Sequence, residues 1–146
     1  MDNKLEPIVQ SLQTEFGATL EEFRGEAHVF VSAGGIVDVL TSLRDKHGFA
    51  LLSTMTAVDY WPQESPRFHV IYQLTSVSKN LFLQVRVPVS GDQPEVPTAS
   101  GVFASAVWRE RELWDMFGIR FAGHPDPRRI LLPPDADFHP MPLSRT

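Results

Sequence analysis

Phe68–Val89 reads F-H-V-I-Y-Q-L-T-S-V-S-K-N-L-F-L-Q-V-R-V-P-V, and this stretch decides the fold. Apolar side chains occupy every second position in its two halves, at Phe68, Val70, Tyr72, Leu74 and at Leu81, Leu83, Val85, Val87, Val89. A period of two residues is typical of a strand with one buried face. The five residues SVSKN between the halves fit a hairpin loop. The stretch therefore predicts two adjacent antiparallel strands.

Further strands are predicted upstream of this hairpin. The segment FALLSTMTAV, residues 49–58, is apolar or weakly polar on both alternations. This pattern predicts a strand that is covered on two sides or lies centrally in its sheet. Between Thr19 and Ser32, two short runs rich in β-branched and aromatic residues are separated by Gly25 and predict a weak hairpin.

Helical periodicity surrounds these strands in three places. Apolar residues recur at helical spacing over residues 5–16, about 35–47 and about 99–117, and a glycine follows each region as a C-terminal stop. The sequence of the third region allows a break near Gly101 or Ser105. The order helix, two strands, helix, three strands, helix indicates a two-layer α+β domain. We expect its helices to pack on one mixed, largely antiparallel sheet.

The periodicity ends near residue 122. We expect residues 1–122 to form the α+β core domain and residues 123–146 to form an extended tail for partner docking. Six of the twelve prolines lie from Pro125 onward, together with several arginines. Proline lowers the entropy that a segment loses on docking. The alternative interpretation is a frayed terminus.

The composition excludes several classes of function. The chain has 146 residues, 42% of them hydrophobic and 21% charged, as in one soluble globular domain. Its formal net charge of -5, without a Lys/Arg-rich run, argues against nucleic acid as a partner. The absence of cysteine excludes Cys-ligated iron–sulfur clusters from this chain. We find no candidate targeting or transmembrane segment in the sequence and expect a cytosolic protein.

The densest motif is W-R-E-R-E-L-W-D-M-F-G-I-R-F-A-G-H-P-D-P-R-R-I-L-L-P, residues 108–133. On a helical wheel, Glu110 falls in the middle of the apolar face. An unpaired carboxylate there is costly, so we expect Glu110 to be buried and paired with an arginine of this chain or of a partner. Glu110→Gln should then weaken folding or assembly by about 1 to 3 kcal/mol.

The opposite side of the wheel carries Trp108, Arg111, Glu112 and Asp115. Arg111 and Asp115 have the spacing of a helix ion pair, and a solvated helix face is the plainer interpretation of the charged residues. The tryptophan favours an interface instead, because Trp and Arg are enriched where proteins meet. Gly118 is a natural C-terminal cap for the helix.

Donor atoms for a catalytic or metal site are present at Glu110, Glu112, Asp115, His124 and Asp126. Their spacing matches neither a di-iron helix nor a zinc protease, and the common nucleophile and phosphate-loop motifs are missing. We therefore expect no catalytic, cofactor-binding or metal site in this chain. The alternative is a stand-alone hydrolase that uses Glu110, Asp115 and His124, which predicts a concave pocket around those three residues.

The motif resembles the signature of the C subunit of the respiratory NADH:quinone oxidoreductase, complex I. The matching residues are Glu110, Arg111, Glu112, Asp115, Met116, Phe117, Gly118, Ile119, Phe121, His124, Pro125, Arg129, Ile130 and Leu131. Asp59-Tyr60 and the alternation over residues 68–76 also resemble the family, so the similarity covers nearly the whole chain. Pro127, where the family commonly has Leu, and the residues after His139-Pro140 depart from the pattern.

The resemblance implies a non-catalytic structural subunit of the peripheral arm of a proton-translocating complex. Its partners would be the large quinone-site subunit and the iron–sulfur subunits, and it would join the cytoplasmic face of the plasma membrane only through the complex. Flavin, iron–sulfur clusters and quinone are implied for the partner subunits, with no cofactor in this chain. The same signature serves energy-converting hydrogenases and ferredoxin- or F420-dependent quinone reductases, whose equivalent subunit is the alternative.

The resemblance also implies where docking occurs, namely on the motif helix and the segment after it. The expected partner-docking residues are Trp108, Glu110, Arg111, Glu112, Asp115, Gly118, His124, Pro125, Arg128 and Arg129. Among them, Arg128 and Arg129 are expected to bind carboxylates of the partner.

Overall fold

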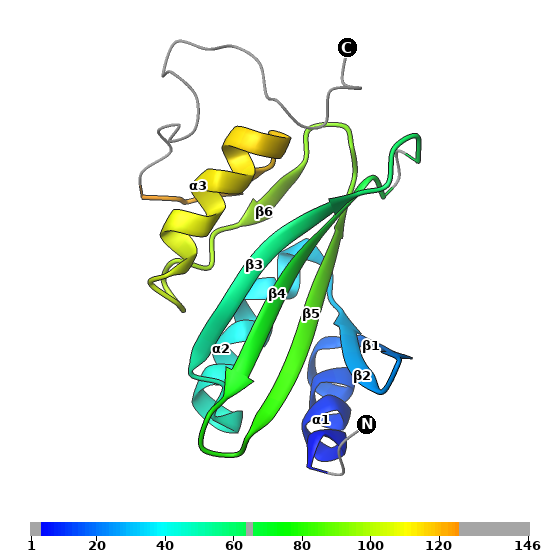
Figure 1. Cartoon of the computed structure of the whole chain (residues 1–146), viewed down its shortest axis with the longest axis vertical. Coiled ribbons are helices and arrows are strands. Elements are labelled where there is room, and N and C mark those ends of the chain that lie inside the picture. The colour runs from blue at the N-terminus through cyan, green and yellow to red at the C-terminus, as the bar shows by residue number, and fades with distance from the viewer. Residues whose placement is uncertain (1–3, 64–65, 126–146) are drawn as a thin grey trace.

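The computed structural model describes residues 4–63 and 66–125, which form a five-stranded sheet with helices on one face (Figure 1). The strand order is β1-β2-β5-β4-β3. The strands are β1 (Thr19–Phe23), β2 (Glu26–Phe30), β3 (Leu51–Asp59), β4 (Phe68–Ser76) and β5 (Leu81–Val89). β2 pairs with β5 in parallel, and the other neighbours are antiparallel. The predicted α+β fold with a mixed, largely antiparallel sheet is confirmed.

Three α-helices lie within the described residues, close to their expected positions. They are α1 (Leu5–Phe16), α2 (Ile36–His47) and α3 (Ala106–Phe117), and a 3-10 turn, η1 (Ala33–Gly35), precedes α2. Each helix ends at a glycine of positive φ, as expected for a left-handed C-terminal cap: Gly17 at 68°, Gly48 at 77° and Gly118 at 74°. No described helix is long and apolar enough to cross a membrane.

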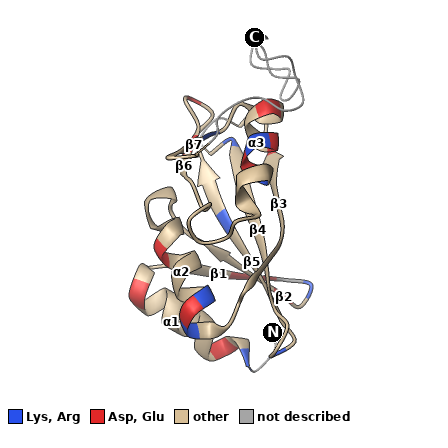
Figure 2. Cartoon of the chain, turned by 90° about the vertical axis from the view of Figure 1, so that its left-hand side faces the viewer, with Lys and Arg blue, Asp and Glu red and all other residues tan. Residues whose placement is uncertain are grey.

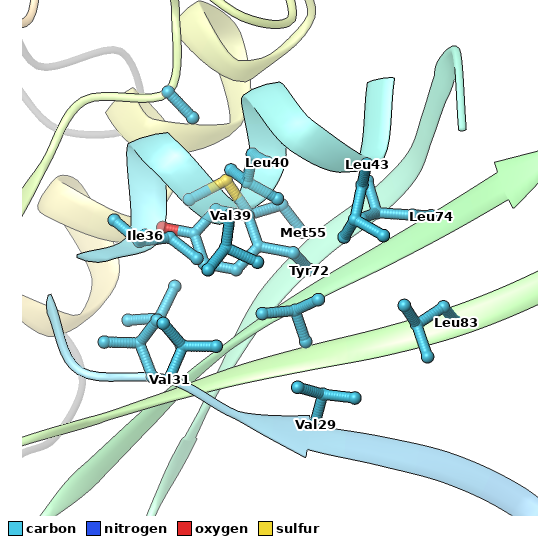
Figure 3. Packing of buried hydrophobic residues seen from close by; sticks show 14 of the residues in the cluster. Val29, Val31, Ile36, Val39, Leu40, Leu43, Met55, Tyr72, Leu74 and Leu83 are labelled. Atoms are coloured by element: carbon cyan, nitrogen blue, oxygen red, sulfur yellow. The ribbon is translucent and has the colours of Figure 1, made fainter. Parts of the chain in front are cut away.

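The core lies between the sheet and these helices. The predicted alternation in β4 and β5 is confirmed, since all of its apolar positions are buried. Figure 3 shows Ile36, Leu40 and Leu43 of α2 lying over Tyr72, Leu74 and Leu83 of the two strands. Burial of such a side chain stabilises the fold by about 1.5 to 3 kcal/mol, so this interface is a main source of stability.

The two hairpins form as expected. At the β1–β2 turn, Arg24 has φ 54° and Gly25 has φ 81°, which is the backbone of a type I′ turn that suits the twist of paired strands. Between β4 and β5 the loop consists of residues 77–80, within the predicted SVSKN segment. The register that these turns set directs the apolar side chains to the helices.

Residues 49–58 were predicted to form a strand that is covered on two sides or lies centrally, and both descriptions are wrong for β3, which is an edge strand with several exposed positions. β3 lies at the edge of the sheet, next to β4 alone among the described strands of that sheet. A bulge between Leu52 and Thr54 shifts the register, so that Leu52 and Met55, three residues apart, are both buried. Because of this break in parity, apolar residues occur on both alternations of the strand. α3 packs against β3.

The third helix and its surroundings also differ from expectation. α3 begins at Ala106 rather than near Ala99, and two turns precede it. The segment between β5 and α3 contains β6 (Glu95–Pro97), which pairs in parallel with β7 (Arg120–Ala122). Figure 2 shows this strand pair close to α3, which carries charges of both signs. The expected domain boundary stays a prediction, because residues 126–146 lie outside the described residues.

Candidate functional site

The motif segment folds into a junction in which Glu110 is the central polar group. α3 directs this side chain inward, where its exposed fraction is 0%. The Thr98 hydroxyl donates a hydrogen bond to Oε1 at 2.5 Å, and the Ala99 amide donates one to Oε2 at 2.8 Å. The predicted burial of Glu110 is confirmed. Within the described residues the predicted arginine partner is wrong, because the polar neighbours of Glu110 are Thr98, Ala99 and His124. An arginine supplied by a partner subunit stays a prediction.

His124 closes the junction from the other side. Its Nε2 lies 2.8 Å from the Val107 carbonyl oxygen. A carbonyl oxygen can only accept, so Nε2 carries a hydrogen and donates a hydrogen bond to the helix backbone. The same nitrogen lies 3.9 Å from Oε1 of Glu110. Because His124 follows β7 and Thr98 follows β6, the two strands hold α3 through both residues. The Thr98 amide also donates to the Ala122 carbonyl oxygen at 2.8 Å, which joins the strands to each other.

Burial raises the pKa of Glu110 above its ordinary value of 4.5. The hydrogen bonds from Ala99 and Thr98 and the charge of His124 act in the opposite direction but are outweighed. Tyr72 lies on the same side of the sheet, and burial together with the Glu110 charge raises the pKa of its hydroxyl. The Glu110 carboxyl group is thus buried and hydrogen-bonded within the protein, as is typical of a structural rather than a solvated acid.

Exposure divides the residues that were expected to dock a partner. Trp108 is 56% exposed, and Pro125 is exposed beyond the end of β7. Arg111 is half-buried, with its guanidinium carbon 5.1 Å from the centre of the Trp108 ring. Glu112 is also half-buried. Trp108 and Arg111 thus form one accessible aromatic–cationic surface on α3, which we call the α3 surface.

Other expected docking residues are not at the surface. Asp115 has an exposed fraction of 0%, so its assignment to a solvated helix face is wrong. Gly118 is buried as the helix cap, and His124 has a side-chain exposure of only 6%. Arg128 and Arg129 lie outside the described residues. Docking through any of these residues stays a prediction.

A pocket of about 410 Å³ opens beside this junction. It is lined by Glu110, Arg111, Trp114, Arg120, Phe121, Ala122, Gly123 and His124. Asp115, the third residue of the hydrolase alternative, is not among them. Both oxygens of Glu110 accept hydrogen bonds, and Nε2 of His124 is directed to the Val107 carbonyl oxygen. The described residues contain no cluster of acidic and histidine side chains that could hold a metal ion.

A second polar junction, at the end of β3, was not among the expected sites. Arg67 is 2% exposed, and its Nε and Nη2 donate to the two oxygens of Asp59 at 2.9 and 3.1 Å. The Trp61 amide donates to the same carboxylate at 3.0 Å, and the Trp61 ring lies 4.6 Å from the guanidinium carbon. An acid that ends one strand and a base that precedes the next could have indicated this pair.

Burial acts to raise the pKa of Asp59, as it does for Glu110. Here the hydrogen bonds from Arg67 and the Trp61 amide, with the positive charge of Arg67, outweigh burial and hold the pKa below its ordinary value of 3.8. The junction therefore contains an ionised pair that positions the two exposed aromatic side chains Tyr60 and Trp61.

Comparison with known proteins places these features in a family context. Residues 29–145 match the family model of the respiratory-chain NADH dehydrogenase 30 kDa subunit. The chain is 47% identical over 119 residues to the NADH-quinone oxidoreductase C subunit of Rhizobium rhizogenes, covering 80% of this chain and 58% of that protein. It is 43% identical over 136 residues to the same subunit of Trichlorobacter lovleyi, covering 91% of this chain and 84% of that protein. The chain thus spans just over half the length of the Rhizobium relative.

Two solved structures share the fold. A trypsin-resistant fragment of Nqo5 is 30% identical with a TM-score of 0.75, covering 84% of this chain and 98% of that one. A chain of the membrane-bound sulfane sulfur reductase, described as an archaeal respiratory membrane complex, is 26% identical with a TM-score of 0.78. That match covers 96% of this chain and 84% of the archaeal one.

Proposed function

Because the chain belongs to the family of the 30 kDa subunit of respiratory-chain NADH dehydrogenase, we propose that it is a structural subunit of such a complex. In this role it braces the large quinone-site subunit and the iron–sulfur subunits of the peripheral arm of a proton-translocating NADH:quinone oxidoreductase. It contributes no redox group of its own, and the isolated chain has no turnover. It is held at the cytoplasmic face of the membrane through its partners.

The arrangement of the motif residues carries this proposal. Polar side chains of the motif that resemble an acid–base site, Glu110 and His124, are hydrogen-bonded within the junction. Their effect is to hold α3 against the sheet and to fix the direction of the exposed Trp108. A rigid surface with an aromatic side chain beside a guanidinium group is suited to binding a protein partner.

The proposal is tested by purifying the tagged chain from native membranes and identifying the subunits that accompany it. Wild type should recover a quinone-binding large subunit and iron–sulfur subunits. Trp108→Ala should reduce this recovery, and Arg128→Ala/Arg129→Ala tests the predicted contribution of the tail. Val77→Ala, which truncates a side chain that is 77% exposed in the β4–β5 loop, is the control and should leave recovery unchanged.

The outcome also decides between functions. Recovery of no partner from cells that express the complex would contradict the proposal. Equal recovery by Trp108→Ala and wild type would contradict the α3 surface while leaving the subunit role intact. Turnover of NADH or an ester by the purified chain alone would favour an independent enzyme.

The equivalent subunit of a related membrane complex is the second candidate. It is favoured by the structural likeness to a chain of an archaeal respiratory membrane complex whose name refers to sulfane sulfur rather than NADH. The same purification separates the two candidates. An NADH-binding flavoprotein among the recovered subunits indicates the NADH-dependent complex, whereas a nickel-binding large subunit indicates a hydrogenase.

A further inference from the structure

The face of the sheet opposite the helices carries a cluster of side chains that the proposed function does not use. Strand pairing places Phe30, Arg86, Ile71 and Thr56 in one row across β2, β5, β4 and β3. In Figure 1, α1 and α2 lie behind the sheet, on the side of its apolar alternation. α3 is on that side too, since its Phe117 ring packs against Phe68. None of the described helices therefore covers the row that contains Arg86.

Arg86 is the charged centre of this open face. Its Nε donates to Oε1 of Gln84 at 2.7 Å, and Nη1 lies 3.2 Å from the Tyr60 hydroxyl and 3.3 Å from Nδ1 of His69. The His69 ring in turn meets the Tyr60 and Phe30 rings edge-on, at centroid distances of 4.7 and 5.8 Å. The guanidinium group is thus half-buried within an aromatic and amide frame.

All of these contacts are with neutral groups. Burial, followed by the charge of Arg86, lowers the pKa of His69, while the charge of Glu21 acts in the opposite direction. Nδ1 of a neutral imidazole can accept a hydrogen bond from Nη1 of Arg86, which lies 3.3 Å away. Among the described residues, no carboxylate lies within ion-pair distance of Arg86. Arg67, by contrast, has both oxygens of Asp59. A half-buried guanidinium group with donors left over is best completed by a carboxylate, which binds it with two parallel hydrogen bonds.

We propose that this open sheet face is a second docking surface, on which Arg86 receives an aspartate or glutamate side chain from a neighbouring subunit. The proposal rests on the proposed function, which supplies the neighbour. Charge complementarity identifies the occupant, and Tyr60 with Phe30 supplies the aromatic rim that excludes water around the ion pair. A second copy of this chain fits less well, because a two-fold contact centred here would bring two Arg86 side chains together.

The test is photo-cross-linking within the assembled complex. Thr56→benzoylphenylalanine places the cross-linker at an exposed position in the same cross-strand row as Arg86. We expect an adduct with another subunit, and the cross-linked peptide should contain an acidic residue. Adding Arg86→Glu should lower the adduct yield by about tenfold or more, because a like charge then faces the partner. Arg86→Lys should retain more of it than Arg86→Gln.

Lys79→Glu is the matched control, since it makes the same charge reversal in the exposed β4–β5 loop and should not change the yield. Thermal melting of each purified variant verifies folding. If Arg86→Glu does not fold, the adduct yields of Arg86→Lys and Arg86→Gln are compared instead, and a higher yield for Arg86→Lys supports the proposal. Equal yields for all Arg86 variants, or an adduct with a second copy or with lipid, would overturn the proposal. So would no adduct in a complex that the tagged wild type still recovers. Failure of the wild type to recover any complex would instead overturn the proposed function, and this proposal with it.

Discussion

Asp59 at the end of β3 is partly buried and Glu110 in α3 is fully buried, and different partners stabilise them. Asp59 faces the guanidinium group of Arg67, whereas Glu110 accepts hydrogen bonds from the Thr98 hydroxyl and the Ala99 amide. Burial acts to raise the pKa of each acid. Only Asp59 has a neighbouring guanidinium group that outweighs burial, and its pKa is lowered while that of Glu110 is raised.

The difference shows how burial and partner charge together determine the role of an acid. At the β3 end, an ionised pair holds a loop with two exposed aromatic side chains, and loss of either charge leaves the other buried. At the α3 junction, neutral donors hold a carboxyl group that tolerates a proton. The first junction should therefore be sensitive to removal of charge, and the second to removal of hydrogen-bond acceptors.

Asp59→Asn should have the largest effect. It removes the carboxylate that accepts two hydrogen bonds from the buried Arg67, and we expect the free energy of unfolding to fall by about 3 kcal/mol, as measured by urea denaturation. Asp45→Asn, which removes the exposed partner of Arg44, is the control and should change stability little. A loss for Asp59→Asn no greater than that of the control would show that the pair is not the stabilising feature. Arg67→Met in addition should recover part of the loss.

Substitution of Glu110 should have an intermediate effect that depends on the new side chain. Glu110→Ala leaves the Ala99 amide and the Thr98 hydroxyl without their acceptor, at an expected cost of about 1 to 3 kcal/mol in urea denaturation. Glu110→Gln keeps one acceptor oxygen and removes a charge that burial disfavours, so we expect a smaller cost than for Ala. This revises the expectation for Glu110→Gln that rested on an arginine partner.

Glu112→Gln, on the half-buried side of the same helix, controls for a change of net charge. If Glu110→Gln is as destabilising as Glu110→Ala, the negative charge itself is required. The contrast between the two junctions would then be incorrect.

The pH dependence of stability should show the smallest effect and opposite signs at the two acids. The raised pKa of Glu110 means that its contribution is fully present below the unfolded value of 4.5 and is lost as pH rises through the folded value. The lowered pKa of Asp59 gives a contribution that is present above 3.8 and is lost as pH falls through its folded value. Each group changes stability by at most about 1.4 kcal/mol per pH unit.

Unfolding curves of wild type, Glu110→Gln and Asp59→Asn between about pH 3 and pH 7 measure these contributions. The difference between wild type and Glu110→Gln should shrink, or turn against wild type, as pH rises above 4.5. The difference between wild type and Asp59→Asn should shrink as pH falls below 3.8. Parallel curves for both variants would mean that neither acid titrates differently on unfolding.

Most of the fold could be predicted because its main elements obey local periodicity. The β4–β5 hairpin alternates every second residue, and the three helices end at glycines of positive φ. The position of β3 at the edge of the sheet could not be predicted, because a bulge at Ser53 interrupts the alternation of buried and exposed side chains. A bulge depends on pairing with the neighbouring strand, which the local sequence does not show. β6 and β7 were missed because three-residue strands have too short a pattern to recognise.

The site was partly predictable for the same reason. A helical wheel was sufficient to place Glu110 inside and Trp108 outside, since both positions follow from the 3.6-residue period. The wheel placed Asp115 on the solvated side, although the fold covers it. The Arg86 cluster joins residues from different strands, so no local pattern could identify its members. The Asp59–Arg67 pair has only the weak local signal of an acid that ends one strand and a base that precedes the next.

By itself, the amino-acid sequence determined the α+β class, the bounds of the strong elements, the family and the burial of Glu110. These features follow from periodicity and from residue identities within one segment. Only the tertiary structure decided that Thr98, Ala99 and His124 surround that acid, and that the Arg86 guanidinium group stands among neutral groups. The reason is physical: the charge state and role of a buried group depend on atoms brought to it by strand pairing and helix packing, which sequence distance does not record.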